Sequence, residues 1–335
     1  MGAAIAAPEE EMMITGEGLS IVMIRVAEYL FLFLVFPGFI FSSVVGLVAG
    51  WVDRKVTARL QWRVGPPWYQ NFVDILKLAL YKETVVPAGV SKAVFLGMPL
   101  VGLAAATLVS TIILVVNGVP AAGFIGDVIV VVYLLLIPSI ALMLGGFASE
   151  NSLASLGASR EMKLMLAYEL PFVLALAVPI LKCGYAIKLG DIILQQAAHG
   201  AVIASPSGVI SFVVMLICIQ AKLGFIPFDM PEAETEIMAG PYIEYSGKAL
   251  AVFKLTKAVL IFAVPMLLVT LYFGGIGFNV QSMARSVGAF VLILVLMILI
   301  KNTNPRVRID QAVKFFWGII TVMAIAAAVL AYLRY

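Results

Sequence analysis

Residues 227–247 read PFDMPEAETEIMAGPYIEYSG, from Pro227 to Gly247, and form an acidic stretch in a strongly apolar chain. The chain is 63% hydrophobic and only 12% charged. Five carboxylates nevertheless fall within sixteen consecutive positions that contain no lysine or arginine: Asp229, Glu232, Glu234, Glu236 and Glu244. Carboxylates this close repel one another, so the stretch calls for a cation, a bound proton or a partner.

The sequence on either side of the acidic stretch predicts an all-α polytopic membrane protein. Backbone groups in lipid must bond within their own segment, which favours helices. Apolar runs of about 17–25 residues, long enough to cross a bilayer, are predicted at 22–50, 93–116, 124–148, 162–183, 207–226, 248–273, 283–301 and 313–333. Residues 22–335 are therefore expected to form one transmembrane domain, after an acidic tail over residues 1–21.

The distribution of basic residues orients these spans. Lysine and arginine are concentrated in the loops near 52–92, 149–162, 222–248 and 301–313, after every second span. Because basic loops stay inside, these four are predicted to face the interior and both termini the outside of the cell membrane. The first of them contains apolar positions at helical spacing between Asn71 and Glu83, which predicts a short interfacial or partner-bound helix.

The acidic stretch itself fits a helix start, with Asp229 as the cap, Pro231 in the first turn and Glu232 reaching back. On such a helix Glu232 and Glu236 would share one face. Gly240 and Pro241 would end it.

Three further charges fall inside predicted spans. Lys254 and Lys257 lie three residues apart and are expected on one face of their span, and Glu169 precedes Pro171 in another. An intramembrane lysine costs at least about 2.5 kcal/mol, so Lys257 is expected to have an acidic partner, either Glu169 or the acidic stretch. Asp127 and Glu28, near the ends of their spans, are expected to be solvated.

The chain offers no evident cofactor site. Cys183 and Cys218 lack metal-type spacing, and His199, the one histidine, lies outside the apolar spans and is expected at the surface. We therefore predict no catalytic, cofactor-binding or metal-binding residue in this chain. Electrons, where involved, would be carried by a partner.

The acidic stretch resembles the signature of the membrane subunit of respiratory complex I that forms the quinone chamber. That pattern is Pro-Phe-Asp-Leu-Pro-Glu-Ala-Glu-x-Glu, then Gly, then Glu-Tyr-Ser-Gly. Three other blocks are similar to the family in order and topology: 54–83 with Gly65-Pro66, 155–171 with Arg160 and Tyr168-Glu169-Leu170-Pro171, and 305–317 with Arg306 and Arg308.

This resemblance implies a subunit that is not catalytic alone and that works in an oxidoreductase complex. Its inner loops would dock a peripheral arm made of a hydrogenase-like large subunit and an iron–sulfur small subunit, with iron–sulfur clusters, or a nickel–iron centre, held by those partners. Antiporter-like membrane subunits and the lipid bilayer would be the other partners, and no nucleic acid is expected. The docking residues would be Arg54, Lys55, Arg59, Arg63, Asp74, Lys77, Arg160, Arg306 and Arg308.

The same resemblance gives the buried charges a role in coupling redox chemistry to proton or sodium pumping. The predicted charge path comprises Asp229, Glu232, Glu234, Glu236, Glu244, Glu169, Lys254 and Lys257. The short Gly65-Pro66-Pro67 loop departs from the complex I pattern and looks more like membrane-bound hydrogenases and sulfur reductases. Lys222-Leu223-Gly224-Phe225, in place of the complex I sequence Glu-Thr-Asn-Arg, makes a quinone a less favoured neighbour. A quinone-chamber subunit, a passive anchor and an autonomous transporter remain the alternatives.

Overall fold

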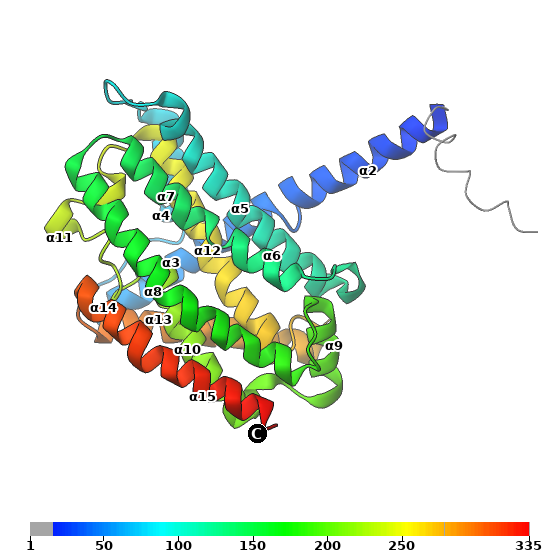
Figure 1. The fold of residues 1–335 in the computed structure, drawn as a ribbon. Coiled ribbons are helices and arrows are strands. Elements are labelled where there is room, and N and C mark those ends of the chain that lie inside the picture. The colour runs from blue at the N-terminus through cyan, green and yellow to red at the C-terminus, as the bar shows by residue number, and fades with distance from the viewer. Residues whose placement is uncertain (1–15, 278, 335) are drawn as a thin grey trace, which may run out of the picture.

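The computed structural model describes residues 16–277 and 279–334, with side chains from Val22 onward, and this part of the chain contains helices and no β-strand. Figure 1 shows a bundle from which one helix projects. The long helices are α2 (Gly16–Leu34), α3 (Phe39–Leu60), α5 (Lys92–Gly118), α8 (Ser152–Lys182), α10 (Pro206–Lys222), α12 (Gly247–Phe273) and α13 (Val280–Thr303).

Two further spans are interrupted. Residues 127–148 form α6 (Asp127–Leu134) and α7 (Ile137–Ala148), and the last span comprises α14 (Ile309–Phe315), a π-helical turn η5 (Phe316–Ile320) and α15 (Thr321–Tyr332). Shorter elements are α4 (Gln70–Leu76), η1 (Lys77–Tyr81), η2 (Pro120–Ala122), α9 (Leu189–His199), η3 (Val202–Ala204), α11 (Glu234–Ile237) and η4 (Gly240–Tyr242).

The all-α membrane fold predicted from the sequence is confirmed. Seven helical segments among the described residues are long and apolar enough to cross a membrane, and α10 is a shorter apolar helix at the predicted fifth span. The amphipathic helix predicted between Asn71 and Glu83 is present as α4 and η1.

Helix α12 lies at the centre of the bundle. Its residues from Ala258 to Tyr272 are buried without interruption, as expected of a helix that is apolar on all sides. It packs against α3, α5 and α13, and a second group of helices, α7, α10 and α15, packs against α8. Gly46 allows α3 to approach α12 closely, because a Cβ at Gly46 would collide with the backbone carbonyl of Ala258.

The first predicted span is wrong in its course. Instead of one helix over 22–50, the chain forms α2, breaks at Phe36-Pro37-Gly38 and continues as α3. Pro37 cannot continue a helix because it lacks an N–H group. Helix α2 projects away from the bundle (Figure 1), and its side chains from Val22 to Phe36 are exposed except for Leu32 and Phe33.

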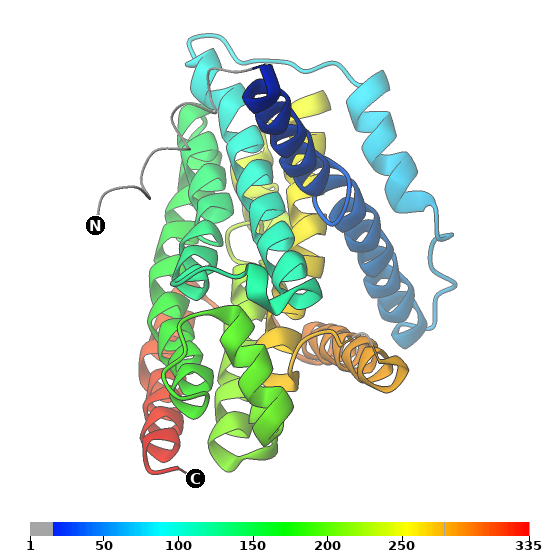
Figure 2. The same ribbon diagram turned by 90° about the vertical axis from the view of Figure 1, so that its right-hand side faces the viewer.

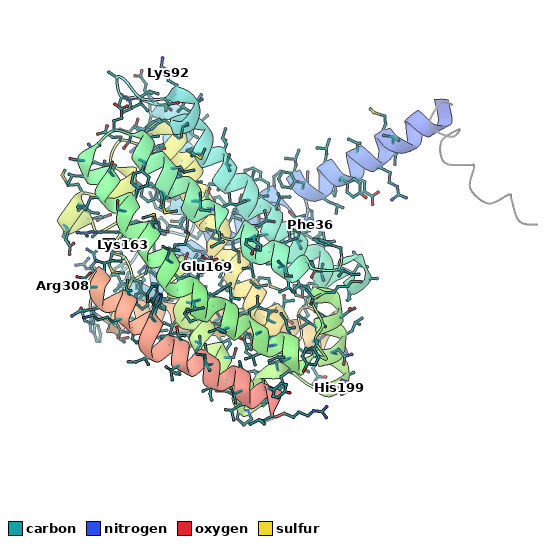
Figure 3. All side chains as sticks on the ribbon, viewed as in Figure 1. Phe36, Lys92, Lys163, Glu169, His199 and Arg308 are labelled. Atoms are coloured by element: carbon teal, nitrogen blue, oxygen red, sulfur yellow. The ribbon has the colours of Figure 1, made fainter. Side chains whose placement is uncertain are left out.

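The four basic loops meet at one end of the bundle, here called the basic end. Figure 3 shows Lys92, Lys163 and Arg308 along this side and His199 at the opposite end. Hydrogen bonds join the loops directly, for example from Asn151 Nδ2 to Glu244 Oε1 at 2.6 Å. The predicted loop at 149–162 is mostly helical, because α8 begins at Ser152, capped by Asn151, rather than near Met162.

Two expectations about the opposite end had different outcomes. His199 is exposed, as predicted. Asp127 is fully buried rather than solvated, and its Oδ1 accepts a hydrogen bond of 2.7 Å from the backbone N–H of Leu189. Asp127 therefore ties α6 to the start of α9, which is a structural role. Figure 2 shows α9 and α10, in green, grouped at this end of the bundle.

The acidic stretch lies directly on α8, at Gly157. A Cβ on Gly157 would lie 2.6 Å from Pro241 Cδ and 2.8 Å from Gly240 Cα. The stretch can therefore reach its position only if residue 157 has no side chain.

We predict that Gly157→Ala displaces the acidic stretch and lowers stability by about 1–3 kcal/mol, the usual cost of overpacking. The measurement is the thermal midpoint of the purified complex. Gly97→Ala in α5 is the matched control, because nothing lies within 4 Å of a Cβ built there. Equal midpoints for the two variants would contradict the proposed contact.

Candidate functional site: a charged cavity beneath the acidic stretch

The acidic stretch does not form the helix predicted from its sequence. Only the short turns Glu234–Ile237 (α11) and Gly240–Tyr242 (η4) are helical before α12 begins, and Asp229 to Glu232 are in irregular chain. Glu232 and Glu236 therefore do not share a helical face. The carboxylates of the stretch instead pair with cations that lie on three different parts of the chain.

Three carboxylates of the stretch form separate ion pairs. Asp229 Oδ2 lies 2.8 Å from Arg306 Nη2, before α14, and Glu236 Oε2 lies 2.8 Å from Arg160 Nη1 on α8. Both oxygens of Glu232 accept hydrogen bonds of 2.8 Å from Lys257 Nζ on α12. These cations remove the repulsion that the sequence alone presents.

The remaining predicted path residues behave differently. Glu234 and Lys254 are exposed, and Glu244 is bonded to Asn151. Lys254 does not share the surroundings of Lys257; its charge acts on Asp74 of α4. Of the two lysines, Lys254 is therefore at the surface, and only Lys257 reaches the interior.

Beneath the acidic stretch is a cavity of about 50 Å³, here called the charged cavity. Four ionisable side chains line it: Glu161, Lys222, Glu232 and Lys257. Ser139, Tyr242 and Thr256 add polar groups. The cavity thus brings together α7, α8, α10, α12 and the acidic stretch at the point where the basic end meets the bundle.

Glu161 and Lys222 were absent from the predicted path. Glu161 is 6% exposed and Lys222 is 7% exposed. The predicted fourth span begins at Met162, one residue after Glu161, and Lys222 belongs to a predicted basic loop, so neither residue is expected in the interior from the sequence. The available signal was that each lies within a helical turn of an apolar span.

Lys222 is held by groups suited to an ammonium ion. Its Nζ donates to the carbonyl oxygen of Leu135 at 3.3 Å, at the break between α6 and α7. It also lies 5.1 Å from the ring centre of Tyr168 and 5.2 Å from that of Phe172. Ring faces attract a cation, and more strongly when it is desolvated.

Glu169 continues this set of charges along α8. Its side chain is half-buried, and the charge of Lys222 acts on it. Figure 3 shows Glu169 part way between Lys163 at the basic end and His199 at the other. It borders an exposed apolar face formed by Leu166, Leu170 and Val173.

A second buried ion pair lies beside the charged cavity. Lys301 Nζ is 2.8 Å from Asp53 Oδ2, and Asp53 is 7% exposed. The ring of Phe225 is close to both lysines, 5.0 Å from Lys301 Nζ and 5.8 Å from Lys257 Nζ. Neither Asp53 nor Lys301 was predicted as a site residue.

The pKa of Asp229 is raised from 3.8 to about 6. Desolvation by burial is the largest cause, and the nearby charge of Glu232 adds to it. The charges of Lys257 and Arg306 act in the opposite direction but do not outweigh burial. Asp229 is therefore suited to exchanging protons near neutral pH.

The predicted docking residues divide into two groups. Arg54 is paired with Asp74 at 2.9 Å, and Arg160 and Arg306 are paired with the acidic stretch, so all four residues have partners within the chain. For Asp74 burial raises the pKa, but hydrogen bonds from Arg54 and Gln70 outweigh it and lower the net value. Of the other predicted docking residues, Arg59, Arg63, Lys77 and Arg308 are exposed, and Lys55 is half-buried.

The donor set of the site does not suit a metal ion. Among the residues that the structure describes, no three His, Cys, Asp or Glu side chains are close enough to bind one. In the charged cavity, each acidic side chain shares the space with a lysine ammonium. The arrangement suits proton exchange between side chains better than metal coordination.

Comparisons with known proteins identify the family of this chain. Residues 31–332 match the family described as NADH dehydrogenase. A subunit of the NADH-quinone oxidoreductase of Anoxybacillus flavithermus, the one designated H, is 32% identical over 286 residues, which cover 82% of this chain and 84% of that protein. The corresponding subunit of Bacillus mycoides is 32% identical over 287 residues, with the same coverage of both chains.

A solved structure is also similar. A chain of the membrane-bound sulfane sulfur reductase, an archaeal respiratory membrane complex, superposes with a TM-score of 0.80 and 28% identity, covering 92% of this chain and 99% of that one. The chain described here therefore belongs to the NADH dehydrogenase family, that of the corresponding membrane subunit of complex I, and is a multi-pass subunit of a complex I-related membrane complex.

Proposed function

We propose that this chain docks an iron–sulfur peripheral arm at its basic end and couples the redox chemistry of that arm to ion translocation. The observation that carries the proposal is the charged cavity, in which Glu232 of the acidic stretch pairs with Lys257 of the central helix. One partner belongs to the surface that would face the arm. The other belongs to the most buried helix of the bundle.

The size and lining of the cavity favour protons as its cargo. A volume of about 50 Å³ has room for a few water molecules, whereas pockets for organic ligands typically measure about 300–1,000 Å³. Two carboxylates and two amines surround this space. In a low dielectric the charge of each of these groups acts strongly on the others, so a change of charge at one alters the energy of a proton on its neighbours.

A series of charged side chains leads from the basic end into the bundle, which supports coupling in that direction. From the basic end inward, Asp229 is half-buried, Glu232 and Lys257 border the cavity, and Glu161 and Lys222 are buried. Glu169 follows along α8, beside an exposed apolar face. We infer that an antiporter-like membrane subunit covers this face, because an intramembrane carboxylate facing lipid is costly.

The basic end has the composition of a docking surface. Trp62 is 99% exposed at the tip of the first loop, between the exposed Arg59 and Arg63. Tryptophan, tyrosine and arginine are the residues most enriched at the energetic centres of protein interfaces. The three arginines already paired within the chain would position the surface rather than contact the arm.

The arm is proposed to be of the hydrogenase or sulfur-reductase type. The similarity to a chain of a sulfane sulfur reductase supports this choice, as do two residues upstream of the acidic stretch. Lys222 is buried in the charged cavity, and Phe225 is 7% exposed beside Lys257 and Lys301. Together they fill this region with a cation and a ring, where complex I subunits carry a Glu-Thr-Asn-Arg sequence.

The coupling role predicts that Lys257→Gln abolishes ion pumping by the intact complex while electron transfer between soluble carriers continues. A positioned group contributes about 10²–10⁴-fold to proton transfer. The measurement is ion uptake in proteoliposomes beside electron-transfer rate. Lys254→Gln, one turn earlier and exposed, is the matched control and is expected to pump.

Loss of Lys257 leaves Glu232 unpaired in a half-buried position, which lowers stability, although by less than the loss of one partner from a fully buried pair. The double variant Lys257→Gln with Glu232→Gln removes that cost and is expected to assemble normally yet still fail to pump. Equal loss of both activities in an assembled complex, or normal pumping by the double variant, would contradict the coupling role.

The raised pKa of Asp229 predicts a pH dependence of stability. Between pH 3.8 and about 6 the folded chain holds a proton that the unfolded chain has released. Stability is therefore highest below this window and falls as the pH rises through it. Asp229→Asn should remove this part of the dependence, on the order of 1–3 kcal/mol.

The measurement is the thermal midpoint of the complex against pH, as the difference between wild type and Asp229→Asn. Glu234→Gln serves as the control, because Glu234 is an exposed carboxylate of the same stretch. A difference curve that is flat across the window, or one that rises with pH, would exclude the proposed titration.

The docking role predicts that Arg59→Gln with Arg63→Gln, and separately Trp62→Ala, reduce copurification of the iron–sulfur subunits while the chain remains in the membrane. Arg285→Gln is the control, since Arg285 is exposed on α13 at the end away from the basic loops. If neither the double arginine variant nor Trp62→Ala lowers the yield of the peripheral subunits below that of Arg285→Gln, this surface assignment is refuted.

A further inference from the structure

A second cavity, of about 250 Å³, lies at the end of the bundle opposite the acidic stretch. It is enclosed by the last residues of α8, the second half of α9 and the turn that leads into α10. Lys182, Gln195, His199 and Ser205 line it. Figure 3 shows His199 at this end, far from Lys163 and Arg308.

The floor of this cavity is held by hydrogen bonds. Gln196 Nε2 donates to the carbonyl oxygens of Thr270 at 3.1 Å and Leu271 at 3.2 Å, and its Oε1 accepts from the backbone N–H of Val202 at 3.3 Å. Gln196 is 5% exposed. The cavity is thus part of the fixed architecture and does not depend on a loose loop.

The wall carries groups that suit an anion. Lys182, at the last residue of α8, supplies the positive charge of the wall. His199 Nδ1 donates to the carbonyl oxygen of Gln195 at 3.3 Å, so the neutral ring adds an acceptor at Nε2 and no charge. The carboxylate of α9, Asp191, lies two turns before His199, where its charge acts on Asp127. The lining itself contains no aspartate or glutamate.

An apolar surface begins where the cavity ends. Val209 and Val213 follow Ser205 at intervals of four residues on α10 and therefore share its face. They are 47% and 38% exposed. An acyl chain lying on this face would have its headgroup at the level of Lys182, where a membrane-spanning helix ends and basic side chains meet headgroups.

We propose that this cavity binds the phosphate-bearing headgroup of an anionic membrane lipid, with one acyl chain along Val209 and Val213. Lys182 attracts the negative charge of the phosphate, and the cavity has room for the headgroup. The adjacent apolar stripe distinguishes a lipid from free phosphate.

The test uses the intact complex in nanodiscs of phosphatidylcholine that contain a spin-labelled lipid. We expect labelled phosphatidylglycerol to be immobilised in preference to labelled phosphatidylcholine, and Lys182→Gln to reduce this preference about fivefold, the effect of one basic side chain near an anionic lipid. Lys182→Arg keeps the charge and should keep the preference. Lys188→Gln, outside the cavity lining, is the matched control.

Three results would overturn the proposal. The first is no preference for phosphatidylglycerol in the wild-type complex, as expected if a partner protein fills the cavity. The second is an equal effect of Lys182→Gln and Lys188→Gln, which would mean a general surface charge. The third is displacement of the labelled lipid by inorganic phosphate, which would mean a site for the free ion.

Discussion

The high cost of an unpaired charge in an apolar bundle determines much of this structure. Several charged groups that enter the bundle at the basic end have partners: Glu232 with Lys257, Asp53 with Lys301, and Lys222 with a carbonyl and two rings. Leaving one partner of such a pair alone would cost several kcal/mol. The acidic stretch is largely irregular, and in this conformation its carboxylates pair with Arg160, Lys257 and Arg306.

This constraint also explains the limits of prediction from the sequence. Apolar periodicity is a local signal, so the helices, the gathering of basic loops and the surface position of His199 could be predicted. The fold of the acidic stretch could not, because its partners Arg160 and Arg306 lie more than sixty residues away in either direction. Local repulsion pointed to a missing cation but could not identify it.

Other differences between the predicted and the observed structure concern the ends of helices. The predicted fourth span begins at Met162, which puts Glu161 in a loop. In the structure the helix begins ten residues earlier, after the Asn151 cap, and Glu161 is buried. Joining α2 to α3 ignored Pro37, whose effect on a helix was readable. Lys257 was correctly expected to pair with the acidic stretch, because the cost of an intramembrane lysine limits its choices.

The charged cavity has a consequence for the balance of ions. With all four lining groups ionised, two carboxylates and two ammonium groups give a formal sum of zero, and Asp53 and Lys301 beside it also cancel. Adding one proton would leave an uncompensated positive charge in a poorly polarisable medium, which is strongly unfavourable. If the charged cavity carries protons as proposed, electroneutrality favours exchange over accumulation, so that a proton that enters on one side is accompanied by one that leaves on another.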